Sequence, residues 1–286
     1  MTEMHFDTAP KANWLGVLLT RKPGLAEGQT LPRFSARLDG MRADILEDYR
    51  AVCGFPEGPN LPLPLPQVVA APLHIAIFTH KDFPLPAMGL VHVSSRIIQH
   101  HPIPADAQMD VHCWMEGHRQ ARKGIEADLI TEVSVGGVLA WESVTTVLTM
   151  AGKGHGKKTA MDEPGSPEPT RSTTWSMPTD LGRRYGSIAG DRNPIHLYPW
   201  TAKLFGFKRH IIHGMWLLAR AVAELEDDLP RGPVQLDVRF KRPVFLPGKA
   251  VFSAGPDAGG HAFGLARPDN GKLHLYGWVG TPGAEE

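Results

Sequence analysis

Two segments of this sequence place similar residues at the same five positions, and this repeat restricts the possible folds more than any other feature. One segment runs from residue 44 to 54 and the other from 180 to 190. Each starts with aspartate, carries apolar residues at helical spacing and ends at glycine, which predicts two short helices. The coincidence indicates an internal duplication. The matched pairs are Asp44 and Asp180, Ile45 and Leu181, Tyr49 and Tyr185, Val52 and Ile188, and Gly54 and Gly190.

Both halves of the chain continue in the same order. An apolar run follows each predicted helix, at 68–78 and at 215–225, and each run is apolar enough for a buried helix. Segments that alternate or run apolar, as sheet strands do, come next. They lie at 89–98, 110–116, 124–135 and 137–150 in the first half, and at 234–240, 249–254, 261–267 and 272–280 in the second.

The halves are separated by residues 151–173, which are rich in Gly, Pro, Lys and Ser and have almost no apolar side chains. Such a composition predicts an exposed linker. We therefore expect a first repeat at 1–150, with residues 1–40 irregular, and a second repeat at 174–286. Each repeat should cover one apolar face of a sheet with its own buried helix.

Composition excludes several classes of protein. Lysine plus arginine and aspartate plus glutamate number 30 each, so no overall field favours nucleic acid or an anionic membrane. No apolar run approaches the length of about 18 residues that a membrane span needs. The two cysteines, Cys53 and Cys113, and the histidines, among them His74 and His92, show no metal-ligand spacing. We expect a cytoplasmic protein without a metal site and treat these histidines as structural or exposed.

The segment 185–215 gathers polar groups of catalytic type between apolar flanks. Gly190, Asp191, Asn193, Pro194 and His196 fall within seven residues. Because proline favours an extended residue before it and suits a first helical position, the carboxylate and the imidazole should flank a bend and face one space. The same string is also ordinary turn chemistry, so a purely structural role has to be weighed against this interpretation.

The whole pattern resembles the MaoC-like, or hydratase-2, dehydratase signature. It comprises Tyr185, the string from Gly190 to His196, Gly206-Phe207, and His213-Gly214-Met215. The resemblance extends to the two-repeat 3-hydroxyacyl-thioester dehydratases and implies an α+β double hot-dog fold. In that fold two antiparallel sheets each wrap a central apolar helix and form a pseudo-dimer in one chain.

The resemblance also implies an activity. Such proteins hydrate 2-enoyl thioesters or dehydrate (R)-3-hydroxyacyl thioesters, with no cofactor, on acyl groups carried by coenzyme A or a carrier protein. Asp191 and His196 would be the acid-base pair and the Gly214 N–H the oxyanion donor. The additional substrate-binding candidates are Asn193, His213, Met215, Lys208 and Arg209, and Lys241 and Arg242 could also meet phosphates.

Some roles and alternatives stay open at this point. Asn193 could brace the bend or hold the water, with bracing favoured, and His213 could orient the loop or pack in the core. A thioesterase of the same fold and a non-catalytic acyl-binding module are the rival functions. The sequence also leaves a homodimer open.

The first half has lost the acid-base pair, since it reads GFPEGPN where the second half reads GDRNPIH. We expect it to hold the acyl tail instead. Its apolar run carries Ala70, Ala71 and Ala76, and Pro72 should kink the helix there. Small residues of this kind also simply allow close packing, so both interpretations are kept.

Overall fold

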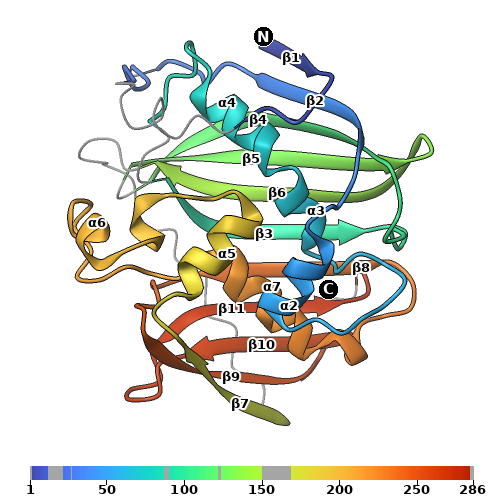
Figure 1. Cartoon of the computed structure of the whole chain (residues 1–286), viewed down its shortest axis with the longest axis vertical. Coiled ribbons are helices and arrows are strands. Elements are labelled where there is room, and N and C mark those ends of the chain that lie inside the picture. Colours follow the sequence, from blue (N-terminus) through green and yellow to red (C-terminus); the bar gives the residue numbers. More distant parts are fainter. Residues whose placement is uncertain are drawn as a thin grey trace.

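A computed structural model describes residues 2–11, 22–26, 28–86, 90–121, 124–149 and 169–283. Within these residues the strands form one eleven-stranded sheet in the order β1-β2-β4-β5-β6-β3-β8-β11-β10-β9-β7 (Figure 1). The first half supplies β1 (Thr2–Phe6), β2 (Phe34–Met41), β3 (Val91–Gln99), β4 (Met109–Ala121), β5 (Gly124–Val135) and β6 (Val138–Thr149). The second half supplies β7 (Arg171–Met177), β8 (Val234–Phe240), β9 (Gly248–Asp257), β10 (Gly260–Ala266) and β11 (Leu273–Gly280).

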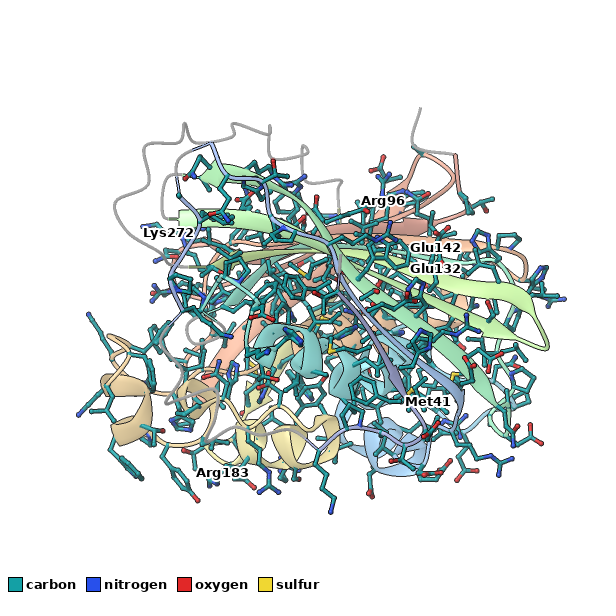
Figure 2. The ribbon with its side chains drawn as sticks, turned by 90° about the horizontal axis from the view of Figure 1, so that it is seen from above. Met41, Arg96, Glu132, Glu142, Arg183 and Lys272 are labelled. Carbon is teal, nitrogen blue, oxygen red and sulfur yellow. The ribbon has the colours of Figure 1, made fainter. Side chains whose placement is uncertain are left out.

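The helices gather on one side of this curved sheet (Figure 2). No helix in the described ranges is long and apolar enough to cross a membrane. The first half contributes α2 (Leu46–Cys53), α3 (Leu65–Val69) and α4 (Ala71–Thr79). The second half contributes α5 (Leu181–Ala189), α6 (Pro199–Lys203), α7 (Gly214–Glu224) and the 3-10 turns η1 (Pro194–His196) and η2 (Glu226–Asp228).

The eight predicted strands all form, but the expected division into two paired sheets is not confirmed, because the strands join in a single sheet. β3 pairs with β8, so that Ser95 lies opposite Val238 and Ile97 opposite Leu236. An unpaired strand edge exposes a row of N–H and C=O groups, and the two halves satisfy these groups by joining edge to edge. One pair, β1 with β2, is parallel, whereas the sequence suggested antiparallel strands throughout.

Residues 1–40 are less irregular than expected, because they contain β1 and most of β2. In β2 the apolar residues Phe34, Ala36 and Leu38 are buried at alternate positions, a period-two signal that is visible in the sequence. β7 begins at Arg171 and so takes up the last three residues of the stretch expected to be a linker. Residues 150–168 lie outside the described ranges.

Both central apolar helices are present, but the first is broken. The run 68–78 divides at Ala70 into α3 and α4, with Pro72 in the first turn of α4. Proline has no N–H to donate to the carbonyl four residues earlier, so one continuous helix cannot form there. In the second half α7 is unbroken and has seven buried residues, including Leu218, Ala219 and Val222.

The two helices of the internal repeat pack against each other at the centre of the molecule (Figure 1). The aromatic rings of Tyr49 on α2 and Tyr185 on α5 have centroids 6.3 Å apart. Both helices end at a glycine with positive φ, 81° at Gly54 and 71° at Gly190, as their shared pattern predicts. Asp44 does not cap α2, because Ile45 is the N-cap residue and no side chain caps the helix.

Candidate active site

The stretch from Gly190 to His196 folds into a tight turn between α5 and α6. The Asp191 carboxylate accepts a hydrogen bond from the Asn193 N–H at 3.0 Å. Asn193 is the N-cap of η1, and its side-chain oxygen accepts from the Ile195 N–H at 3.3 Å. Asp191 and Asn193 therefore brace the turn to which they belong, and for Asn193 this bond favours the bracing role over the water-holding one.

The His196 ring is held from its other side by the segment that precedes α7. Its Nδ1 lies 2.8 Å from the carbonyl oxygen of Ile211. A carbonyl can only accept, so Nδ1 carries the proton and Nε2 keeps a lone pair in the neutral ring. The Ile211 N–H donates in turn to the Ile195 carbonyl at 3.0 Å, which fixes the position of the ring relative to η1.

His213, the N-cap residue of α7, joins the same cluster. Its ring stacks on that of His196 with centroids 3.7 Å apart and 26° between the planes. Its Nε2 donates to the backbone carbonyl of Asp191 at 3.1 Å and lies 3.7 Å from the carboxylate. The ring therefore ties the Asp191 loop to the start of α7, which is the orienting role that the sequence left open.

Burial sets the protonation of these groups. It lowers the pKa of His196 to about 3, assisted by His213 and opposed by Asp191, and it also lowers the pKa of His213. Burial alone would raise the pKa of Asp191, but the neighbouring His213 and His196 rings and the Asn193 N–H hold that pKa below its ordinary value. Near neutral pH the site therefore combines a carboxylate with neutral imidazoles.

Two glycines of α5 allow this turn to lie directly on the helix. A Cβ atom at Gly182 would stand 2.3 Å from the His196 carbonyl oxygen, and one at Gly186 would stand 2.6 Å from the Asp191 carbonyl oxygen. Residues four apart share one face of a helix. This face of α5 therefore determines how closely the backbone of Asp191 and His196 can approach the helix. The sequence did not reveal this role of the two glycines.

The first half carries an arginine at the position of the repeat that matches Gly186. The Arg50 side chain is buried, and its guanidinium donates to the carbonyls of Gly58 and Asn60 at 2.6 and 3.0 Å. A side chain thus holds the loop of the first half, whereas the turn of the second half rests on glycine. The loss of the acid-base pair from GFPEGPN is accompanied by a different way of packing the loop.

The site opens into a cavity of about 1120 Å³ that both halves line. α7 begins at Gly214, so the first N–H groups of this helix have no acceptor within it. These groups lie at the end of the helix that lines the cavity. A Cβ atom at Gly214 would approach the Phe240 ring to 3.1 Å, which leaves little room for a side chain. The predicted site residues that line the cavity are Asp191, Asn193, His196, His213, Gly214 and Met215.

His74 and His92, which the sequence analysis treats as structural or exposed, both line the same cavity. His74 on α4 is buried, with Nε2 2.9 Å from the Thr131 hydroxyl. Burial lowers the pKa of His92, while the charge of Asp191 acts to raise it. His92 belongs to β3, and only the pairing of β3 with β8 brings this strand to the second half of the chain. Nothing in the sequence around it signals that position.

Of the four basic residues proposed from the sequence as substrate or phosphate contacts, only Lys241 and Arg242 line the cavity. Lys208 and Arg209 are exposed and are not among the residues that line it, and the Arg209 guanidinium lies over the Phe245 ring at 5.8 Å. Phe207, next to them, does line the cavity. The cations that line it are Arg119, Arg239, Lys241 and Arg242.

One group of side chains in the described residues has the spacing of metal ligands. The donor atoms of Asp191, His196 and His213 all lie within 4.8 Å of one another. Neutral imidazoles and a carboxylate are suitable ligands for zinc. The same three groups can equally hold a water molecule by hydrogen bonds, which is the arrangement that acid-base chemistry requires.

Comparison with known proteins identifies the second half most directly. Residues 157–255 match the model of the MaoC like domain family. The chain is 36% identical over 238 residues to 3-hydroxyacyl-thioester dehydratase X of Mycobacterium tuberculosis, covering 81% of this chain and 82% of that protein.

Solved structures agree with this similarity. The crystal structure of HtdX of M. tuberculosis superimposes with a TM-score of 0.76 at 32% identity, covering 86% of this chain and 99% of that one. A MaoC-like dehydratase from Phytophthora capsici superimposes with a TM-score of 0.66 at 18% identity, covering 88% of this chain and 96% of the other. This second likeness concerns the fold alone.

Proposed function

The chain belongs to the family of MaoC-like 3-hydroxyacyl-thioester dehydratases, and from this premise we propose that Asp191 and His196 are the acid-base pair of its hydro-lyase reaction. The observation that supports the assignment best is the defined tautomer of His196. The bond from Nδ1 to the Ile211 carbonyl leaves the Nε2 lone pair free, and His196 and Asp191 line the cavity with donor atoms within 4.8 Å of each other. A water molecule can be held between two such acceptors.

In the hydration direction, the hydroxyl of this water bonds to C3 of the 2-enoyl thioester and its proton passes to the pair. The pair returns one proton to C2, so that it ends the reaction unchanged. Dehydration is the reverse. A positioned acid-base group of this kind contributes about 10² to 10⁴ in rate.

Negative charge develops on the thioester oxygen as the C3–O bond forms. The Gly214 N–H at the start of α7 is suited to stabilise that charge, because it has no acceptor within the helix and the helix dipole adds to its effect. Removal of one oxyanion donor costs about 10² to 10³ in rate. The absence of a side chain at Gly214 lets the thioester approach the backbone.

We propose that the part of the cavity lined by the first half holds the acyl tail. α4 presents Ala71, Ile75 and Phe78 to the cavity, at positions that share one helical face. Ala70 is fully buried and, like Ala76, is not among the lining residues. Of the three alanines expected beside the tail, only Ala71 is therefore suitably placed.

The thioester carrier contains phosphates in both of its forms, coenzyme A and the phosphopantetheine arm of a carrier protein. We assign the phosphate contacts to Arg239, Lys241 and Arg242, which line the cavity, in place of Lys208 and Arg209. The product should be the (R)-3-hydroxyacyl thioester, as the family resemblance implies, and chiral analysis of the product tests this. Activity should survive treatment with a metal chelator.

The test of this function uses crotonyl-CoA, whose enoyl absorbance falls on hydration. Absorbance should fall without release of free thiol, whereas thiol release would indicate a thioesterase and binding without turnover a non-catalytic module. Asp191→Asn and His196→Ala should each lower kcat by about 10² or more while the protein remains folded. Near-parental turnover by either variant would refute the acid-base assignment.

A further inference from the structure

The segment that follows the catalytic turn exposes a compact group of large apolar side chains. Tyr198, Trp200 and Leu204 are three of the five large hydrophobic residues that stand exposed in the described residues, Trp200 at 65% and Leu204 at 76%. Figure 1 shows α6, which carries Trp200, at the edge of the molecule away from the sheet. We call Tyr198, Trp200, Lys203 and Leu204 the α6 patch. Exposed apolar groups that cluster in this way mark interaction sites.

The two aromatic rings of the patch are held by contacts within the chain. The rings of Tyr198 and Trp200 stack with centroids 6.0 Å apart and 16° between the planes. The Arg183 guanidinium, at the surface of the helical layer in Figure 2, lies 4.8 Å from the centre of the Tyr198 ring. Arg183 is itself fixed by a bond of 2.8 Å to the Leu197 carbonyl. A preorganised aromatic surface loses little entropy on binding.

The segment that carries this patch has charge of one sign only. Between residues 192 and 209 the sequence has no aspartate or glutamate, although the whole chain is neutral. The cations of this segment are exposed, and none of them forms an ion pair with another residue of the described ranges. These cations are Arg192, Lys203, Lys208 and Arg209. An acidic partner is therefore complementary to the surface.

The α6 patch is also linked by hydrogen bonds to residues that line the cavity and to the turn that carries His196. Ala202 is fully buried, and its carbonyl accepts the N–H groups of Phe205 and Phe207, two residues that line the cavity. The Thr201 hydroxyl donates to the carbonyl of Pro194 at 2.6 Å, in the turn that carries His196. A macromolecule bound at the patch would thus stand beside the cavity that receives the thioester.

We propose that the α6 patch is the docking surface for an acidic acyl-carrier protein, which presents its thioester to the neighbouring cavity. This proposal rests on the proposed function, since it names the partner that delivers the substrate. A second copy of the chain fits less well, because a symmetric contact would place two cationic rims against each other. Free coenzyme A needs no apolar surface outside the cavity.

The test compares one acyl group on two carriers. The parent and the variants Trp200→Ala, Leu204→Ser and Lys203→Glu are assayed with crotonyl-CoA and with crotonyl-loaded carrier protein. Each variant should lose about tenfold in kcat/KM for the carrier-protein substrate, as truncation of a central interface residue does. Activity on crotonyl-CoA should stay within about twofold of the parent. Val138→Ser, an exposed apolar residue on the hairpin between β5 and β6, is the matched control and should change neither.

Binding of unloaded holo carrier protein, titrated without catalysis, tests the surface separately from the chemistry. Binding should weaken in the three variants and at high salt. Equal losses on both substrates, or no loss on either, would overturn the proposal. The proposal would also be overturned if the three variants lost binding to anionic lipid vesicles but kept binding to the carrier protein. If crotonyl-CoA is not hydrated by the parent, the proposed function fails, and the titration alone decides the docking surface.

Discussion

Gly182→Ala adds a single methyl group to α5 and should strongly impair catalysis without weakening the helix. The new Cβ atom would stand 2.3 Å from the His196 carbonyl oxygen, whereas carbon-oxygen contacts ordinarily begin at about 3.3 Å. The turn must therefore move by about 1 Å. A displacement of that size at a catalytic group costs about 10² in rate. Alanine also favours helix over glycine by about 1 kcal/mol, so loss of the helix is not the expected cause of the defect.

The assay is kcat and KM for crotonyl-CoA hydration together with the thermal midpoint of unfolding. We expect kcat to fall about 100-fold with a smaller change in KM. Gly186→Ala, whose Cβ would stand 2.6 Å from the Asp191 carbonyl oxygen, should behave similarly. Ser187→Ala is the matched control, since its exposed hydroxyl donates only within α5, to the Arg184 carbonyl. A folded Gly182→Ala variant with parental kcat would show that the turn does not depend on close contact with α5.

Three further changes test other parts of the site. Gly214→Val should lower kcat by about 10² or more, because its Cβ lies 3.1 Å from the Phe240 ring and its branches crowd the oxyanion donor; full activity would place that donor elsewhere. Ala71→Phe should reduce kcat/KM for long enoyl thioesters far more than for crotonyl-CoA, since each tail methylene contributes about 0.8 kcal/mol. Ala76→Phe, away from the cavity lining, should leave the dependence of kcat/KM on chain length unchanged. The same dependence in both variants would contradict the proposed position of the tail. Burial lowers the pKa of His74 from 6.5 to about 3, so between these pH values the unfolded chain binds one more proton and the free energy of unfolding falls as pH falls. In denaturant titrations, His74→Gln should reduce the slope of this free energy against pH by up to about 1.4 kcal/mol per pH unit. An unchanged slope would refute the linkage to His74.

Local patterns predicted the elements of this fold well, because each depends on residues close in the sequence. The alternation of Val234, Leu236 and Val238 marked β8, and the glycine at the end of each repeated helix marked its stop. β1, β2 and β7 were missed, although β2 carries a readable alternation; β1 and β7 lie at the two ends of the sheet (Figure 1). Such short edge strands bury few side chains and carry a weak apolar pattern.

The candidate site was predicted only as far as one continuous motif extends. Asp191, His196 and Gly214 lie on the cavity because a turn and a helix start bring them there, and both were readable from Asn-Pro and from the apolar run. His92 could not be found in this way. It comes from the other half of the chain, and no periodicity or spacing links His92 to Asp191, which follows it by 99 positions.

The sequence by itself determined the repeat, the two central helices, the strands that flank them and the chemical groups at the turn. All of these follow from short-range rules of propensity, capping and amphipathic spacing. The tertiary structure alone decided that the two halves join through β3 and β8, that Gly182 and Gly186 support the turn carrying Asp191 and His196, and that Arg239 rather than Arg209 lines the cavity. These features depend on edge pairing and on distances between atoms far apart in the chain. A linear pattern of residue types does not contain such distances.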